Sequence, residues 1–188
     1  MTLFRTLSAF ALCAAALMAA DAAPSASQVF DRQLKTTERE FTSLVEAMPA
    51  DRFGFAPKQG AFDGVRTFAQ EAKHAAFVLY EVSSAMLGEK NPSLSGADEN
   101  GPDTVRSKEE IVKYVNGAFA LAHRAVATLT NENLMQETTD PFDPKGKRTR
   151  VDSAGILFWH TFDHYGQMVE YARMNGVIPP ASQPQPKR

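Results

Sequence analysis

Cysteine is almost absent from this chain, since its 188 residues contain a single one, Cys13. It lies in an uncharged stretch rich in Leu and Ala, residues 6–20, which an Ala-Asp-Ala motif follows at residues 20–22. A short basic start, an apolar run and a small-residue cleavage motif are typical of a secretory signal peptide. We therefore expect residues 1–22 to be removed and the mature protein to be periplasmic or secreted. Without Cys13, cysteine-based metal sites and Cys–His catalysis are excluded.

Long hydrophobic runs and an excess of one charge are also missing. The run at residues 6–20 is shorter than the roughly 20 residues that cross a bilayer, although an uncleaved anchor is its alternative interpretation. The 20 Lys and Arg stand against 22 Asp and Glu, a balance that gives no electrostatic basis for nucleic-acid binding. With 44% hydrophobic and 22% charged residues, the composition is that of an ordinary globular domain.

Four stretches have the apolar periodicity of amphipathic helices, and we expect helices at about residues 27–48, 65–87, 107–130 and 152–175. The motif Ser107-Lys-Glu-Glu110 is a capping box, Gly88 is expected to end the second helix, and Asp152 or Ser153 to cap the fourth. The predicted core is made of one stripe from each helix: Phe30, Leu34, Phe41, Leu44, Val45 and Met48; Phe68, Ala72, Ala76, Leu79, Val82 or Ser83, and Met86; Ile111, Tyr114, Val115, Ala118, Phe119, Ala122, Val126 and Leu129; and Ala154, Leu157, Phe158, Thr161, Tyr165, Met168 and Ala172.

Long connections rich in turn-forming residues join the predicted helices, at residues 50–64, 89–104 and 131–150. The last contains a basic run at residues 145–150, interpreted as a solvated loop, with anion binding as the alternative. No segment alternates convincingly enough to predict a strand. The sequence therefore predicts an all-α four-helix bundle at residues 23–180 with long inter-helix connections, followed by a disordered Pro- and Gln-rich tail at residues 181–188.

Half of the four histidines lie in one turn of the last predicted helix, at His160 and His164. Their spacing stacks both imidazoles on one helix face, and imidazole is the commonest metal ligand in proteins. His74 in the second helix is the best candidate for a third ligand, because ligands in a bundle converge from facing helices. Histidines that are hydrogen-bonded in the core or at its rim, without metal, are the alternative. His123 is expected on a solvated face.

Four neighbouring residues have two interpretations each. Asp163 and Gln167 are either hydrogen-bonding partners of the histidine pair or exposed side chains. Gly166 either lets a neighbouring helix approach or is a tolerated helix glycine. Glu71 is the nearby candidate for a general base on the second helix, or it is a surface residue.

The order of these motifs along residues 27–180 resembles the DinB-like superfamily. The resemblance rests on the pattern His160-x3-His164-x-Gly-Gln, on the later Gly176 and paired prolines, and on Phe68-Ala-Gln-Glu-Ala-Lys-His74, which is similar to the family's histidine in the second helix. It implies a DinB-like four-helix bundle with a divalent metal site whose three ligands are His74, His160 and His164.

Three neutral imidazoles leave an open metal position, as in catalytic sites, and Zn, Ni, Fe or Mn all accept such ligands. Related enzymes include bacillithiol transferases and a mycothiol-dependent isomerase, but export away from a reduced thiol cofactor argues against thiol transfer here. The leading hypothesis is an exported, metal-dependent hydrolase or transferase that acts on an unidentified small molecule. The alternatives are a non-catalytic module that binds metal or a small ligand, and a metal-free interaction bundle. A homodimer is an open alternative for the assembly.

Overall fold

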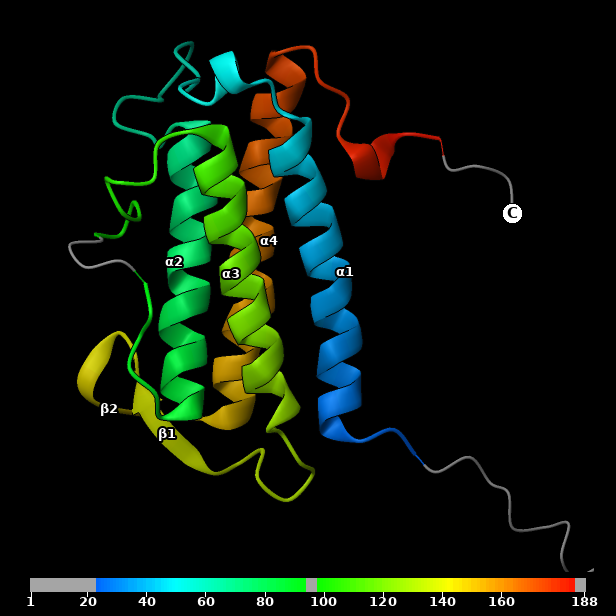
Figure 1. Cartoon of the computed structure of the whole chain (residues 1–188), viewed down its shortest axis with the longest axis vertical. Coiled ribbons are helices and arrows are strands. Elements are labelled where there is room, and N and C mark those ends of the chain that lie inside the picture. Colours follow the sequence, from blue (N-terminus) through cyan, green and yellow to red (C-terminus); the bar gives the residue numbers. More distant parts are fainter. Residues whose placement is uncertain (1–22, 94–97, 185–188) are drawn as a thin grey trace, which may run out of the picture.

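The computed structural model describes residues 23–93 and 98–184, and four long helices run side by side along its long axis (Figure 1). The helices are α1 (Ala26–Ala47), α2 (Phe68–Leu87), α3 (Lys108–Ala127) and α4 (Arg150–Met174), with short 3-10 helices η1 (Ala50–Arg52) and η2 (Pro180–Ser182). The predicted four-helix bundle is confirmed, and each helix lies within a few residues of its expected range. The predicted signal peptide, residues 1–22, lies outside the described residues.

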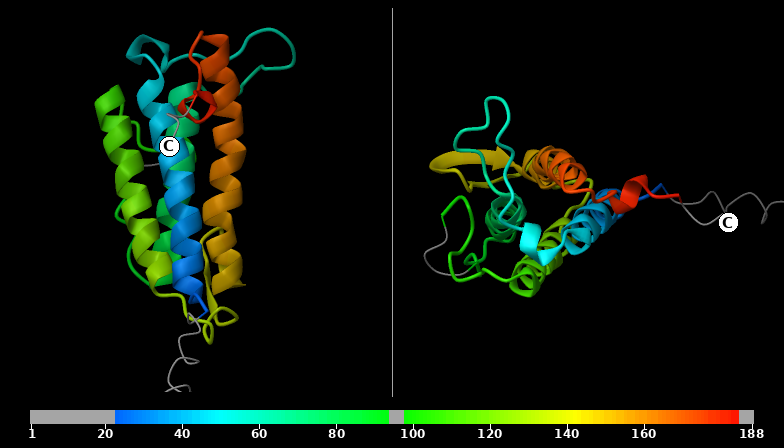
Figure 2. Two further views of the ribbon diagram at one scale, coloured as in Figure 1. Left: turned by 90° about the vertical axis from the view of Figure 1, so that its right-hand side faces the viewer. Right: turned by 90° about the horizontal axis from the view of Figure 1, so that it is seen from above.

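The order of the helices around the bundle explains why the connection between α2 and α3 is long. Both α2 and α3 run from the top of Figure 1 to the bottom, whereas α1 and α4 run upward. Because α2 and α3 are parallel neighbours, the chain between them has to return along the length of the bundle. Helix α2 also packs against α4, and α1 packs against α3 and α4, so α2 and α4 share an interior face (Figure 2).

A Ser or Thr hydroxyl caps the first turn of every long helix, through Ser25, Thr67, Ser107 and Thr149. The predicted capping box of α3 is confirmed, since Glu110 N donates to Ser107 Oγ over 3.1 Å and Glu110 Oε2 accepts from Ser107 N over 2.9 Å. The predicted cap of α4 at Asp152 or Ser153 is wrong. Thr149 has the extended backbone that a cap requires, and its hydroxyl accepts from the Asp152 backbone N–H.

The core between the helices consists mainly of the predicted stripes. Leu34, Phe41, Phe68 and Phe119 are fully buried, and burial of each such side chain contributes about 1.5–3 kcal/mol to folding. Other predicted core residues lie at the rim and are half-buried: Phe30, Phe158 and Tyr165. The interior of the bundle is therefore apolar, and polar groups buried within it need specific partners.

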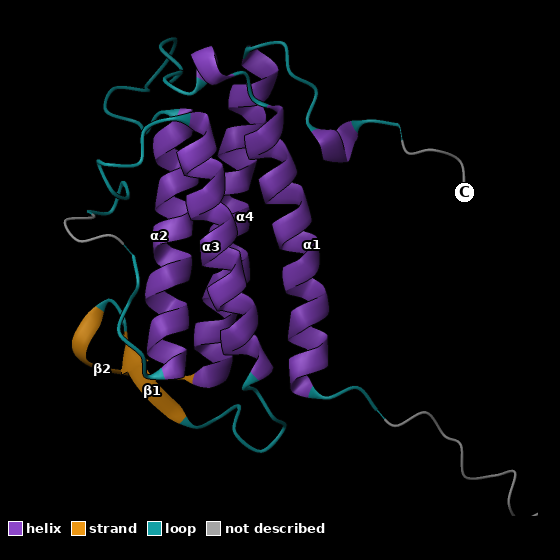
Figure 3. Cartoon of the chain, in the orientation of Figure 1, coloured by secondary structure: helices purple, strands orange, loops and turns teal. Residues whose placement is uncertain are grey.

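A β-hairpin in the third connection was not predicted (Figure 3). Strands β1 (Glu137–Asp140) and β2 (Asp143–Thr149) pair antiparallel, so most of the basic run is strand and not a loop. Arg148 of this run pairs with Asp140 over 2.9 Å and with Asp152 over 2.7 Å. The strands are polar, and their described side chains are exposed or half-buried, so no apolar alternation marked them in the sequence.

The C-terminal end of the described chain is partly ordered against the bundle. The predicted disordered tail begins at residue 181, yet residues 180–182 form η2, which lies against α1. Arg173 Nη2 donates to Ser182 Oγ over 3.0 Å. Within the described ranges, no helix has the length and apolar character needed to cross a membrane.

Candidate metal centre

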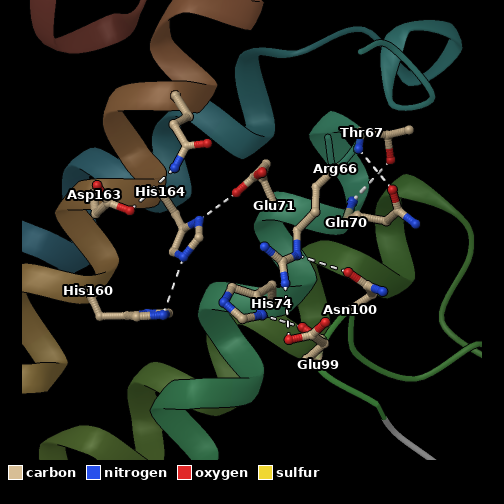
Figure 4. Close-up of polar contacts among 11 residues, drawn as sticks. Arg66, Thr67, Gln70, Glu71, His74, Glu99, Asn100, His160, Asp163 and His164 are labelled. Atoms are coloured by element: carbon tan, nitrogen blue, oxygen red, sulfur yellow. Dashed lines mark hydrogen bonds and ion pairs between the residues drawn. The ribbon is translucent and has the colours of Figure 1, made fainter. Parts of the chain in front are cut away.

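The structure brings His74 of α2 together with His160 and His164 of α4 on the interior face that these two helices share (Figure 4). Each ring offers one nitrogen, and the three nitrogens lie within 4.8 Å of one another. The ring centroids of His74 and His164 are 4.5 Å apart, and those of His74 and His160 are 5.1 Å apart. The predicted convergence of the three histidines is therefore present, although His160 and His164 lie 86 and 90 positions after His74 in the chain. That they bind a metal stays a prediction.

Two of the rings are held in the tautomer that a metal requires. The Nδ1–H of His164 donates to Glu71 Oε2 over 2.5 Å, and the Nδ1–H of His74 donates to the backbone carbonyl of Glu99. Because each Nδ1 is engaged as a donor, each Nε2 presents its lone pair. Hydrogen bonds of this kind fix the orientation of metal-binding histidines and raise their basicity.

The spacing of the ligand atoms fits a small divalent ion. The Nε2 atoms of His160 and His164 are 3.3 Å apart. A tetrahedral ion with metal–nitrogen bonds of about 2.0–2.1 Å places two ligand nitrogens roughly 3.3–3.4 Å apart. Without a metal, one of these two nitrogens must carry a hydrogen and donate it to the other, and a cation would replace that hydrogen. The residues present therefore fit the metal that the resemblance implies.

The protonation state of the rings also suits a metal. Burial, together with the neighbouring imidazoles of His164 and His74, lowers the pKa of His160 to about 3. Burial is likewise the main cause that lowers the pKa of His74. Both rings are thus neutral near pH 7, which is the form that binds metal. The Nδ1 of His160 is buried and has no hydrogen-bond partner among the described residues.

Glu71 is a buried partner of the site and not a surface residue. Its side chain is only 2% exposed and its carboxylate is bonded to His164. It lies three residues before His74 on α2, a spacing that puts both on the same side of the helix. Of its two interpretations, the surface residue is therefore wrong, and the i, i+3 spacing is the one sequence signal that indicates its position beside the site.

The connection after α2 also supports the site, and no pattern in the sequence indicates this contact. Besides the Glu99 carbonyl on His74, Lys73 Nζ donates to the Pro102 carbonyl over 3.0 Å. Gly101 has a φ of +77°, and a Cβ there would lie 2.7 Å from the Cβ of Lys73. The chain around residues 98–102 thus approaches α2 more closely than a side chain would allow.

The other candidates near the histidine pair lie outside the site. Asp163 and Gln167 are exposed and bonded to each other over 3.3 Å. Gly166 is exposed and, apart from its own stretch of α4, no atom lies within 4 Å of where its Cβ would be, so of its two interpretations the approach of a neighbouring helix is wrong. His123 of α3 is partly exposed, and its ring nitrogens contact Asp31 and Glu38 of α1.

A four-helix bundle in which α2 and α4 bring three histidines together is compatible with metal binding. The chain belongs to the DinB superfamily, whose sequence profile matches residues 33–168 and so includes all three histidines. No curated protein matches the chain.

Two solved structures share the fold. A DinB-like protein from Bacillus cereus ATCC 10987 is 17% identical, with a TM-score of 0.62, over 80% of this chain and 93% of that protein. A conserved protein from Enterococcus faecalis is 16% identical, with a TM-score of 0.63, over 81% of this chain and 98% of that protein. At these identities the similarity establishes the fold and nothing about activity.

Proposed function

We propose that this chain binds one divalent transition-metal ion through His74, His160 and His164, and that the open side of this site serves a hydrolytic or group-transfer reaction. The observation that carries the proposal is the set of three converging imidazoles, two of which have Nδ1 fixed as a donor. Zn, Ni, Fe and Mn all accept imidazole nitrogen, so the donor set admits each of them.

The chain's own residues have separate roles in this proposal. Glu71 orients His164, and its negative charge favours a cation at the site. The Glu99 carbonyl orients His74 without adding charge. Three protein ligands are the number found in catalytic rather than structural zinc sites, and a bound ion would supply Lewis-acid chemistry there.

A non-catalytic module that binds metal or a small ligand is the second candidate. It is favoured by one observation, namely that the Glu71 carboxylate is engaged with His164 and is 2% exposed. A carboxylate held in this way is not available to remove a proton from a substrate. The reaction, if there is one, needs another group or the ion itself to activate the nucleophile.

Metal titration of chelator-stripped protein tests the site. We expect one ion for each chain by calorimetry and elemental analysis, and loss of at least tenfold in affinity in His160→Ala or His164→Ala. His123→Ala is the matched control, because it removes the one histidine outside the cluster and should leave metal binding unchanged. Equal affinities in all three variants would refute the site, and absence of binding in wild type would favour a metal-free interaction bundle.

Turnover separates the two candidates. Metal-loaded protein is assayed against a panel of carboxylic esters, phosphoesters and amides, in parallel with His160→Ala and His123→Ala. Activity that depends on metal, is lost in His160→Ala and survives in His123→Ala supports the enzyme. A panel without any metal-dependent turnover favours the binding module.

Export is a separate part of the proposal and rests on the pattern of residues 1–22. We expect protein recovered from the producing cells to begin after Ala22. N-terminal sequencing measures this directly, and a chain that still begins at Met1 or Thr2 would contradict the predicted signal peptide.

A further inference from the structure

We infer that the metal site takes a substrate or ligand with a small anionic group, a carboxylate or a phosphate, which Arg66 binds next to the metal position. The inference rests on the proposed metal site and names the chemistry of what enters it. Arg66 immediately precedes Thr67, the N-cap of α2, and its guanidinium lies beside the histidines in Figure 4.

The position of Arg66 is fixed by the same segment that orients His74. Its Nε donates to Asn100 Oδ1 over 2.9 Å, and its Nη2 lies 3.5 Å from Glu99 Oε2. The backbone carbonyl of Glu99 accepts the hydrogen bond from His74. One residue, Glu99, therefore contacts both the guanidinium and a proposed metal ligand, which holds the two next to each other.

In Figure 4 the guanidinium of Arg66 lies next to the imidazole of His74. This placement agrees with the electrostatics of the site, because the charge of Arg66 is, after burial, among the causes that lower the pKa of His74 and of His160.

The contacts of Arg66 leave some of its guanidinium hydrogen-bond donors free for a ligand. Asn100 offers a neutral amide oxygen, and the Glu99 carboxylate is 75% exposed and beyond ordinary hydrogen-bond length. Among the described residues, nothing bonds to Nη1 of Arg66, whose side chain is 26% exposed. A guanidinium therefore remains with free donors at the edge of the site.

The charge count determines the class of ligand. A divalent ion and Arg66 together bring three positive charges, against the buried carboxylate of Glu71 and the exposed carboxylate of Glu99, so one positive charge remains in excess. Two cations side by side repel unless an anion lies between them. A planar guanidinium binds carboxylate and phosphate oxygens through two parallel hydrogen bonds, so an oxyanion that bridges Arg66 and the metal satisfies both.

The test uses full-length mature protein loaded with Co²⁺, a spectroscopic substitute for zinc, and titrated with acetate in one arm and phenylphosphonate in the other. We expect the visible cobalt bands to change with at least one anion and not with neutral acetamide. In Arg66→Gln, cobalt stoichiometry stays at one while the anion Kd rises about tenfold or more, as expected for loss of a charge-assisted pair. Arg66→Lys keeps the positive charge but loses the planar guanidinium, so its anion Kd should lie between those of wild type and Arg66→Gln.

Arg52→Gln is the matched control, since Arg52 of η1 is exposed and pairs only with the neighbouring Asp51 among the described residues. Anion affinities that are equal in Arg66→Gln and Arg52→Gln would overturn the inference, as would equal binding of acetate and acetamide by wild type. Whether acetate or phenylphosphonate changes the cobalt bands shows whether the site prefers a carboxylate or a phosphate group. Failure of wild type to take up cobalt would refute the proposed metal site itself, so the two failures are distinguishable.

Discussion

Replacement of Glu71 by Gln tests how far the buried carboxylate supports the metal site. The side chain is 2% exposed, and its Oε2 lies 2.5 Å from Nδ1 of His164. Glu71→Gln keeps the shape and one acceptor oxygen, so the Nδ1–H of His164 is still satisfied. What is lost is the negative charge that raises the basicity of the imidazole and offsets the charge of the ion.

The magnitude follows from this chemistry. Removal of a hydrogen-bonding partner behind a metal ligand typically reduces metal affinity about 10- to 100-fold, or roughly 1.4–2.7 kcal/mol. Because Gln still accepts the hydrogen bond, we expect Glu71→Gln to be near the lower end, about tenfold. Glu71→Ala leaves a buried donor unpaired and should be near the upper end.

Competition with a chromophoric chelator measures both variants against Glu170→Gln, which removes an exposed carboxylate from α4 with no ion pair among the described residues. The melting temperature of each stripped variant shows whether the fold persists. If Glu71→Gln binds metal within twofold of Glu170→Gln, the negative charge of Glu71 does not strengthen His164 as a metal ligand.

Two further predictions concern the supports of the site and its protonation. Gly101→Ala should reduce the free energy of unfolding, measured by urea denaturation, by more than about 1 kcal/mol and should weaken metal binding, because the left-handed backbone and the 2.7 Å approach to Lys73 leave no room for a Cβ. Gly54→Ala is the control, since nothing lies within 4 Å of a Cβ at that position. Equal free energies of unfolding in the two variants would contradict this reasoning. Between pH 7 and pH 5 the metal-free protein should lose about 2 kcal/mol of unfolding free energy, because His160 takes up a proton below about pH 6.5 when unfolded but only near pH 3 when folded. Urea denaturation across this range should show a smaller loss of unfolding free energy in His160→Gln. The same dependence of unfolding free energy on pH in both proteins would contradict His160 as the cause.

The helices and the histidine cluster could be predicted because periodicity reports burial directly. His160, His164 and His74 lie on apolar stripes, and two helices that pack by those stripes bring the rings together. The Ser107 capping box and the left-handed Gly88 at the end of α2 are local signals, and both are present.

The rest depends on tertiary contacts that leave no local pattern. The hairpin is polar, and its place is set by contacts such as that of Thr138 Oγ1 with the Ala85 carbonyl at the end of α2. Whether Glu71 faces water or the core depends on how α4 packs against it. The carbonyl of Glu99 reaches His74 only because α2 and α3 are parallel and the connection returns beside α2.

The three-histidine site is tested most directly by locating the metal in crystals of the loaded protein, by anomalous diffraction at the absorption edge of the bound ion. We expect one peak for each chain, about 2.0–2.1 Å from Nε2 of His74, His160 and His164 if the ion is zinc. A principal peak elsewhere, or a peak that lacks any of these three nitrogens as a ligand, would contradict it.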